Sequence, residues 1–577
     1  MTAWIVLSSI ALLLILLVHG RIAPAPLFAG LASCYYLFGL LDQKAWLASY
    51  TNPALAMLVM LLLVSLVIER SPILERVSDK LLRGSPVGAV LRFTSITALF
   101  SAFLNNTAVV GALLGVVTKQ RHHPASLLLI PLSFAAIAGG ITTLVGTSTN
   151  LVVSSLMTNA GMSPLGMFDP AWVGVPVALV CIVVLAFCVR LLPRHSANSR
   201  EAQQAYFLEA RVEHTSSLIG RSIEQNRLRN LEGLFLLEIM RDGRLISPVA
   251  PAEVIEVGDV LIFTGEIDKM SALQRFDGLQ VFGVEADALL RSNLLEVVVS
   301  SQSELANKTL REVDFRTMFD AGVVGIRRGD KRLTGQLGRV PLHVGDSLLL
   351  AVGPDFANHR NIDRNFHLVG GTVRPRLTPM QSRLTLTGFA AVIALSGLEI
   401  LPLFTGLLLL LAGLVLSGLL TLAEMRRRFP FDLVLTIGSS LAIAQVLDNS
   451  GAAELMTGAL RMLYDGHGVI GAFIGIYLLT VILTELVTNN AAAALAFPIA
   501  LSTARAFDAD PMPFVMAVLY GASAGFLIPF GYQTHLMVYS PGRYRMLDFV
   551  RVGLPVSIAY GATVLLLVPV FFPFARM

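Results

Sequence analysis

Long apolar runs occupy both ends of the chain and predict membrane-spanning helices. A helix needs about 20 residues to cross the roughly 30 Å of hydrocarbon in a bilayer. Runs of about this length or longer lie near 3–18, 26–41, 54–69, 94–118, 125–158, 171–192, 384–422, 431–449, 468–505, 512–540 and 550–574. The pattern therefore predicts a polytopic α-helical membrane protein.

Four polar interruptions break these runs, two in each half of the chain. They are Leu104–Thr107 with Gly146–Asn150, and Val487–Asn490 with Gly531–His535. Asn106 and Asn150 are 44 residues apart, and Asn489 and His535 are 46 apart. A straight helix would expose the paired amides to lipid at a cost of a few kcal/mol each, which a re-entrant hairpin buried in protein avoids. Each half is therefore predicted to hold one re-entrant hairpin and one broken helix, as midplane sites of secondary transporters require.

Charge is concentrated between the two apolar ends. Residues 193–376 hold 23 of the 43 lysines and arginines and 24 of the 39 aspartates and glutamates. Arginines flank this region on both sides, and flanking basic residues mark cytoplasmic connections. The sequence thus predicts a cytoplasmic insertion between two membrane halves, 1–192 and 384–577. An odd number of membrane elements in each half would make the halves inverted repeats.

The inserted region is itself duplicated at an offset of 87 residues. Leu218–Ile223 aligns with Leu305–Leu310, and Val257–Leu261 with Val344–Leu348. Short alternating runs separated by turn signals predict an α+β module in each copy. The unit resembles the TrkA C-terminal (RCK-C) domain, as a tandem pair covering 206–283 and 292–369. That resemblance implies a regulatory or dimerising module.

A regulatory nucleotide of unknown identity stays open for this pair. Binding in the Rossmann manner is disfavoured because no G-x-G-x-x-G sequence occurs in 193–376. The charged cluster of Arg327, Arg328, Lys331 and Arg332 is more typical of a solvated hairpin face than of a nucleotide clamp.

The polar interruptions offer only neutral ligands. Asn, Ser and Thr side chains and freed backbone carbonyls are suitable donors for a weakly held Na⁺. The half-helices that begin after each interruption present positive dipole ends, which favour an anion. Coupled binding of Na⁺ and an anion follows from this pattern.

The interruptions resemble the Ser-Asn-Thr hairpin motifs of the divalent anion:sodium symporters, within the ion transporter superfamily. The resemblance covers both membrane halves. It implies sodium ligands at Ser101, Asn105, Asn106 and Gly146, and at Thr484, Thr488, Asn489 and Gly531. It implies an anion site formed by Asn105, Asn106, Thr107, Thr149, Asn150, Thr488, Asn489, Asn490, Thr534 and His535.

Departures from the dicarboxylate pattern bear on the anion. Asn105 replaces a serine, Asn490 replaces a threonine, and His535 stands where Asn is common. Thr147–Thr149 replaces a proline-containing stretch and resembles sulfate-type members. The expected anion is therefore a compact tetrahedral oxyanion first and a C4 dicarboxylate second. His535 also permits a pH-dependent role or a purely structural one.

Other interpretations remain at this point. Polar residues in membrane helices often serve packing. Glu485 is an intramembrane carboxylate that fits a proton-linked group, a support for the sodium site or a hairpin cap. Glu424 and Asp448 are expected to be solvated. A cation exchanger of the same superfamily, or a channel or sensor controlled by the TrkA-C pair, are the alternative functions.

Together these features predict a secondary transporter and not an enzyme. It would be a homodimer in the bacterial inner membrane, surrounded by lipid, that couples Na⁺ entry to uptake of a divalent oxyanion. The net charge of +4 is attributed to orientation in the membrane rather than to nucleic acid.

Overall fold

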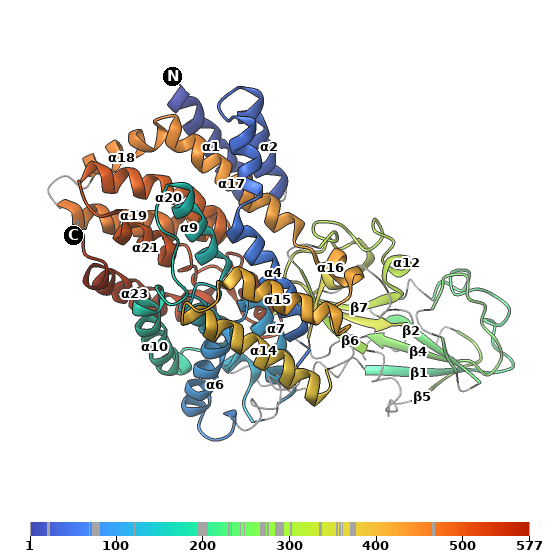
Figure 1. The fold of residues 1–577 in the computed structure, drawn as a ribbon. Coiled ribbons are helices and arrows are strands. Elements are labelled where there is room, and N and C mark those ends of the chain that lie inside the picture. Colours follow the sequence, from blue (N-terminus) through green and yellow to red (C-terminus); the bar gives the residue numbers. More distant parts are fainter. Residues whose placement is uncertain are drawn as a thin grey trace.

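The structure is a computed structural model that describes residues 2–19, 24–68, 70–71, 81–120, 122–193, 377–463 and 468–575, and most of 206–369. Figure 1 shows a body of helices with the inserted strands to one side. Both ends of the chain contribute to the helical body.

The first half contains short and long apolar helices. They are α1 (Thr2–His19), α2 (Pro24–Leu37), α3 (Gln43–Tyr50), α4 (Pro53–Ile68), α6 (Pro86–Ser101), α7 (Asn106–Lys119), α8 (Leu129–Gly140), α9 (Ser148–Asn159) and α10 (Ala171–Phe187), with the 3₁₀ turns η1 (Ala125–Leu127) and η2 (Cys188–Arg190). The predicted run 125–158 is not one span, because it is broken between α8 and α9.

The second half begins after the inserted region. Its helices are α14 (Pro379–Gly397), α15 (Leu403–Leu416), α16 (Leu422–Arg428), α17 (Phe431–Asn449), α18 (Ala452–Leu463), α19 (Gly468–Leu486), α20 (Asn489–Ala506), α21 (Pro511–Gly521), α22 (Gln533–Tyr539) and α23 (Met546–Phe571). Among the described residues of the chain, five helices are long and apolar enough to cross a membrane. The prediction of a helical, multi-pass membrane protein is confirmed.

Helices of the first half pack directly against helices of the second half. Helix α2 packs against α17, α4 against α15, and α9 against α20. Arg70, just after α4, forms an ion pair of 2.5 Å with Glu424 of α16, and both side chains are mostly buried. The expectation that Glu424 is solvated is therefore wrong. Its carboxylate also caps α16 through Thr421, so it joins a local turn to the other half of the chain.

The inserted region forms two antiparallel five-stranded sheets. The first has the order β3-β2-β4-β1-β5 and the second β10-β6-β9-β7-β8. Their strands are β1 (Tyr206–Val212), β2 (Leu234–Arg241), β3 (Arg244–Ile246), β4 (Val260–Gly265), β5 (Leu279–Phe282), β6 (Leu294–Val299), β7 (Ala321–Arg328), β8 (Lys331–Leu333), β9 (Ser347–Val352) and β10 (Phe366–Leu368), with the short helices α12 (Phe315–Phe319) and α13 (Ile362–Asn365) and the 3₁₀ turn η4 (Leu337–Arg339).

The two sheets repeat each other in detail at the 87-residue offset. A bulge at Leu236/Glu238 in the first recurs at Val323/Gly325 in the second. Arg241 donates two hydrogen bonds to buried Asp259, and Arg328 donates two to buried Asp346. These hydrogen bonds raise the pKa of both guanidinium groups above the usual value. Each copy thus joins its β2–β4 or β7–β9 pair through an arginine that binds a buried aspartate.

The second sheet meets the membrane helices at the end of α22. The Gly329 N–H donates to Ser540 Oγ at 3.2 Å, and Ser540 Oγ donates to the Gly345 carbonyl at 2.5 Å. Arg545 donates to Asp330 at 2.8 Å. The tip of the turn between β7 and β8 therefore packs against the membrane helices through Gly329 and Asp330, while Lys331 beside it is exposed. Figure 1 places β6 and β7 nearer the helices than β1 and β5.

Candidate functional site

The first polar interruption forms the turn between α6 and α7. Asn105 caps α7, and its side chain accepts a hydrogen bond of 2.9 Å from the Thr107 N–H. One amide atom of Asn106 lies 2.7 Å from Ser101 Oγ, 3.0 Å from the Ala136 carbonyl and 3.2 Å from the Gly146 carbonyl. When this atom is nitrogen, it donates to all three oxygens. Asn106 is thus the centre of a small oxygen-lined cluster.

The second interruption repeats this arrangement between α19 and α20. Thr484 and Asn489 stand five residues apart, as Ser101 and Asn106 do. Thr484 Oγ1 lies 3.1 Å from Asn489 Oδ1 and donates to the Ala522 carbonyl at 2.6 Å. Thr488 is the N-cap residue of α20. In both halves a hydroxyl near the end of one helix therefore faces an asparagine that begins the next helix.

The break between α8 and α9 is held by Asn150. Its amide nitrogen donates to the Thr143 carbonyl at 2.7 Å and to the Gly140 carbonyl at 3.4 Å. Gly146 is in close contact with the backbone of Gly140 and Ala102, leaving no room for a Cβ. These contacts explain how seven residues without helical hydrogen bonds stay ordered inside the helical body.

The break between α21 and α22 is held in a related way by His535. Its Nε2 bonds the Gly525 carbonyl at 2.9 Å, and its Nδ1 bonds Ser133 Oγ of α8 at 2.7 Å. His535 and Gly525 lie 385 residues after Asn150 and Gly140, so the two contacts correspond. Both ring nitrogens of this fully buried histidine have protein partners.

Each turn contacts the break of the opposite half. Thr107 Oγ1 lies 3.4 Å from Gln533 Oε1 at the start of α22. Asn490 Oδ1 accepts from Ser148 at 3.2 Å and from Thr149 at 3.4 Å, at the start of α9. The polar residues that the sequence placed in separate halves are therefore brought together in two crossed pairs.

Tyr532 connects the two crossed pairs. Its hydroxyl lies 3.2 Å from the Asn106 amide and also hydrogen-bonds the side chains of Thr147 and Asn489. The sequence analysis placed Tyr532 and its neighbour Gln533 in the interruption Gly531–His535 but named neither as a ligand. The available signal was their position: Tyr532 directly precedes the half-helix α22, and Gln533 is its first residue.

Burial divides the predicted site residues into two groups. Thr488 is exposed, and Asn105, Thr107, Asn489, Asn490 and Gly531 are partly exposed. Ser101, Asn106, Gly146, Thr149, Asn150, Thr484, Thr534 and His535 are buried. The Asn150 Oδ1 and Thr534 Oγ1 atoms have no hydrogen-bond partner within the part of the chain that is described. The site thus has an accessible rim of hydroxyls and amides over a buried layer of oxygens.

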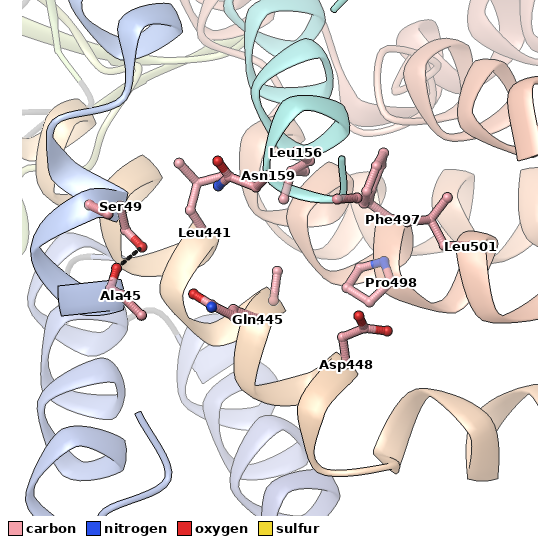
Figure 2. A pocket seen from close by; sticks show the side chains of 13 residues that line it. Ala45, Ser49, Leu156, Asn159, Leu441, Gln445, Asp448, Phe497, Pro498 and Leu501 are labelled. Carbon is pink, nitrogen blue, oxygen red and sulfur yellow. Dashed lines mark hydrogen bonds between the residues drawn. The ribbon is translucent and has the colours of Figure 1, made fainter. Parts of the chain in front are cut away.

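A cavity of about 220 Å³ lies at the other end of two site helices. Figure 2 shows it where α3, α9, α17 and α20 meet, with Gln445, Asp448 and Asn159 among the lining side chains. Asp448 lies 3.6 Å from Arg505, and both side chains are partly exposed to solvent. None of the lining residues is a predicted sodium or anion ligand.

Helices that start at crossed turns with neutral polar side chains, set in a multi-pass helical body, are typical of membrane transporters. The sequence matches the citrate transporter family (CitMHS) over residues 1–521. The chain belongs to this family of anion transporters.

Two of three similar proteins are named as transporters. A Chlamydomonas reinhardtii protein named "Putative sulfur deprivation response regulator" is 32% identical over 552 residues, covering 90% of this chain and 93% of that protein. The "Uncharacterized transporter sll0640" of Synechocystis sp. is 29% identical over 90% of this chain and 89% of its own length. "Sodium/sulfate cotransporter 1" of C. reinhardtii is 30% identical over 62% of this chain and 42% of its own length.

Proposed function

We propose that this protein is a sodium-coupled symporter of a divalent oxyanion, with sulfate as the first candidate and a C4 dicarboxylate as the second. The observation that carries the proposal is the matched pair of oxygen clusters, Ser101–Asn106 and Thr484–Asn489, joined by crossed contacts. Packing alone does not require the same cluster at both turns.

The geometry at Asn106 supports a cation site. The amide atom that faces Ser101, Ala136 and Gly146 is within 3.2 Å of three oxygens. Turning the amide by half a rotation places its own oxygen there and its nitrogen toward Tyr532. Four neutral oxygens would then surround one position, a donor set that suits Na⁺. Asn105, Thr488 and Gly531 would complete the two sodium sites from the partly exposed rim.

The anion is proposed to bind between the crossed turns. Helices α7, α9 and α20 all begin there, and the positive dipole ends of these helices favour a negatively charged ligand. Thr107, Thr488 and Asn490 supply hydrogen-bond donors on the accessible side, with Asn105, Asn106, Thr149, Asn150, Asn489, Thr534 and His535 behind or beside them. The named sodium/sulfate cotransporters among the relatives favour a sulfate-like ligand.

The wider architecture is part of the same proposal. We take the α6–α7 and α19–α20 turns as re-entrant hairpins, and the halves as inverted repeats related by offsets of 383 to 385 residues. The two sheets are taken as a tandem TrkA-C module on the cytoplasmic side, in domains 206–283 and 292–369. The protein would work as a homodimer in a bacterial inner membrane, and any nucleotide at the module is unidentified.

Uptake by reconstituted protein tests the function directly. Radiolabelled sulfate or succinate is added to the buffer outside the proteoliposomes. An inward Na⁺ gradient is present, or choline replaces the Na⁺. We expect sulfate accumulation that depends on Na⁺, and a smaller succinate signal. Accumulation of neither anion, or equal accumulation in choline, would refute the symporter.

The contact between the second sheet and α22 gives a test of regulation. Ser540→Ala removes one donor and one acceptor that join the module to α22, and neutral hydrogen bonds are worth about 1 kcal/mol each. Because α22 starts at the anion site, we expect the KM for the anion to rise about fivefold. Ser557→Ala on α23, whose hydroxyl has no partner in the described chain, is the matched control. Equal KM values in the two variants would mean that the contact between the second sheet and α22 does not influence the anion site.

A further inference from the structure

The second break, between α21 and α22, contains backbone N–H and C=O groups that lie outside the hydrogen-bond pattern of a helix. Residues 522–532 connect α21 to α22 without regular secondary structure. Inside a membrane protein, each N–H and C=O of such a stretch needs a protein partner. Three neighbouring side chains supply partners: Thr484 to the Ala522 carbonyl, His535 to the Gly525 carbonyl, and Glu485 to two N–H groups.

Glu485 uses both of its oxygens in this role. Oε1 accepts from the Leu527 N–H at 3.0 Å, and Oε2 accepts from the Ile528 N–H at 3.3 Å. Gly531 lies over the same carboxylate, because a Cβ built there would be 3.7 Å from Oε2 and 3.7 Å from the Thr484 carbonyl. The carboxylate therefore adjoins Gly531, a proposed sodium ligand, and follows Thr484 of the second oxygen cluster directly in the chain.

The first half has no counterpart of this carboxylate. Ala102 stands 383 residues before Glu485, in the same relation to Ser101 as Glu485 has to Thr484. There the Thr143 hydroxyl donates to the Ala102 carbonyl, and the Asn150 amide donates to the carbonyls of the break. The hydrogen bonds named for the first break thus come from neutral groups, whereas those of the second include an acidic one.

We propose that Glu485 is a positioning residue that fixes the second break and makes the second sodium site the tighter of the two. It does so by holding the 527–531 backbone in place and by setting an acidic group beside Thr484 and Gly531. This inference rests on the proposed sodium symport. A carboxylate that accepts two backbone N–H groups is occupied as an acceptor, so its role differs from that of a mobile proton carrier.

Sodium-dependent thermal unfolding of the purified full-length protein in detergent tests the inference without transport. Na⁺ is titrated against choline at constant ionic strength, because a ligand that binds the folded state raises the Tm. Glu485→Gln keeps one acceptor but loses the second oxygen acceptor and the acidic group. We expect the Na⁺ concentration for half the maximal Tm shift to rise about tenfold. Glu485→Asp, which shortens the side chain, should raise it about threefold.

Glu399→Gln is the matched control, because Glu399 is exposed at the turn after α14 and its titration should overlay the wild type. A lower Tm for Glu485→Gln with an unchanged Na⁺ midpoint would overturn the inference and leave a structural role. If that variant does not fold, an unchanged midpoint in Glu485→Asp would overturn it equally. Absence of any Na⁺ effect on the wild type would instead refute the proposed sodium symport, and the inference with it.

Discussion

Replacing Asn106 by Ala is expected to lower Na⁺-dependent sulfate uptake about 100-fold. The amide touches Ser101, two backbone carbonyls and Tyr532 at once. Its loss removes a proposed sodium ligand and leaves the buried carbonyls of Ala136 and Gly146 with fewer partners. Each of these losses costs about 1–3 kcal/mol, and the loss of the ligand oxygen falls on the sodium-bound state. Initial uptake rates in proteoliposomes over a range of Na⁺ concentrations measure it.

Asn489→Ala provides the internal comparison and Asn449→Ala the control. Asn489 occupies the equivalent place in the second half, so its loss should also raise the Na⁺ requirement. Asn449 is an exposed amide at the last residue of α17, and its removal should leave uptake unchanged. An unaltered apparent Na⁺ affinity in both Asn106→Ala and Asn489→Ala would remove both asparagines from the sodium sites.

The free-energy cost of exposing polar side chains to lipid explains why the main features of this site could be predicted from sequence. Two amides in the middle of an apolar run cannot face lipid without a large energetic cost, so Asn105 and Asn106 predict a turn that is buried in protein. The 87-residue offset likewise follows from two landmark pairs, because a repeated chain builds a repeated sheet. The structure extends it to a shared bulge and to the Arg241–Asp259 and Arg328–Asp346 ion pairs.

Long-range partners could not be predicted. Glu424 lies near a predicted span end, and nothing local indicates that Arg70, 354 residues away, is its partner. Tyr532 resembles any aromatic residue in an apolar segment, yet it joins Asn106, Thr147 and Asn489. His535 matched a ligand position by resemblance, whereas the contacts with Ser133 and Gly525 also give it a role in holding the second break.

A glycine substitution separates the geometry of the sodium site from the chemistry of its ligands. Gly140 ends α8, and a Cβ on it would overlap the Asn106 amide. Gly140→Ala keeps every proposed ligand, but it pushes this amide away from Ser101 and Gly146. Core positions without free volume do not absorb an added methyl group. We therefore expect a loss of Na⁺-dependent uptake approaching that of Asn106→Ala.

Gly413→Ala is the matched control, because a Cβ there meets nothing within 4 Å on α15. In a helix interior this change favours folding by up to about 1 kcal/mol, so uptake and yield should be retained. Gly140→Ala with wild-type Na⁺ affinity would mean that the Asn106 amide can move without consequence. The oxygen cluster around it would then be packing, and the sodium site would have to lie among the other polar residues of the crossed turns.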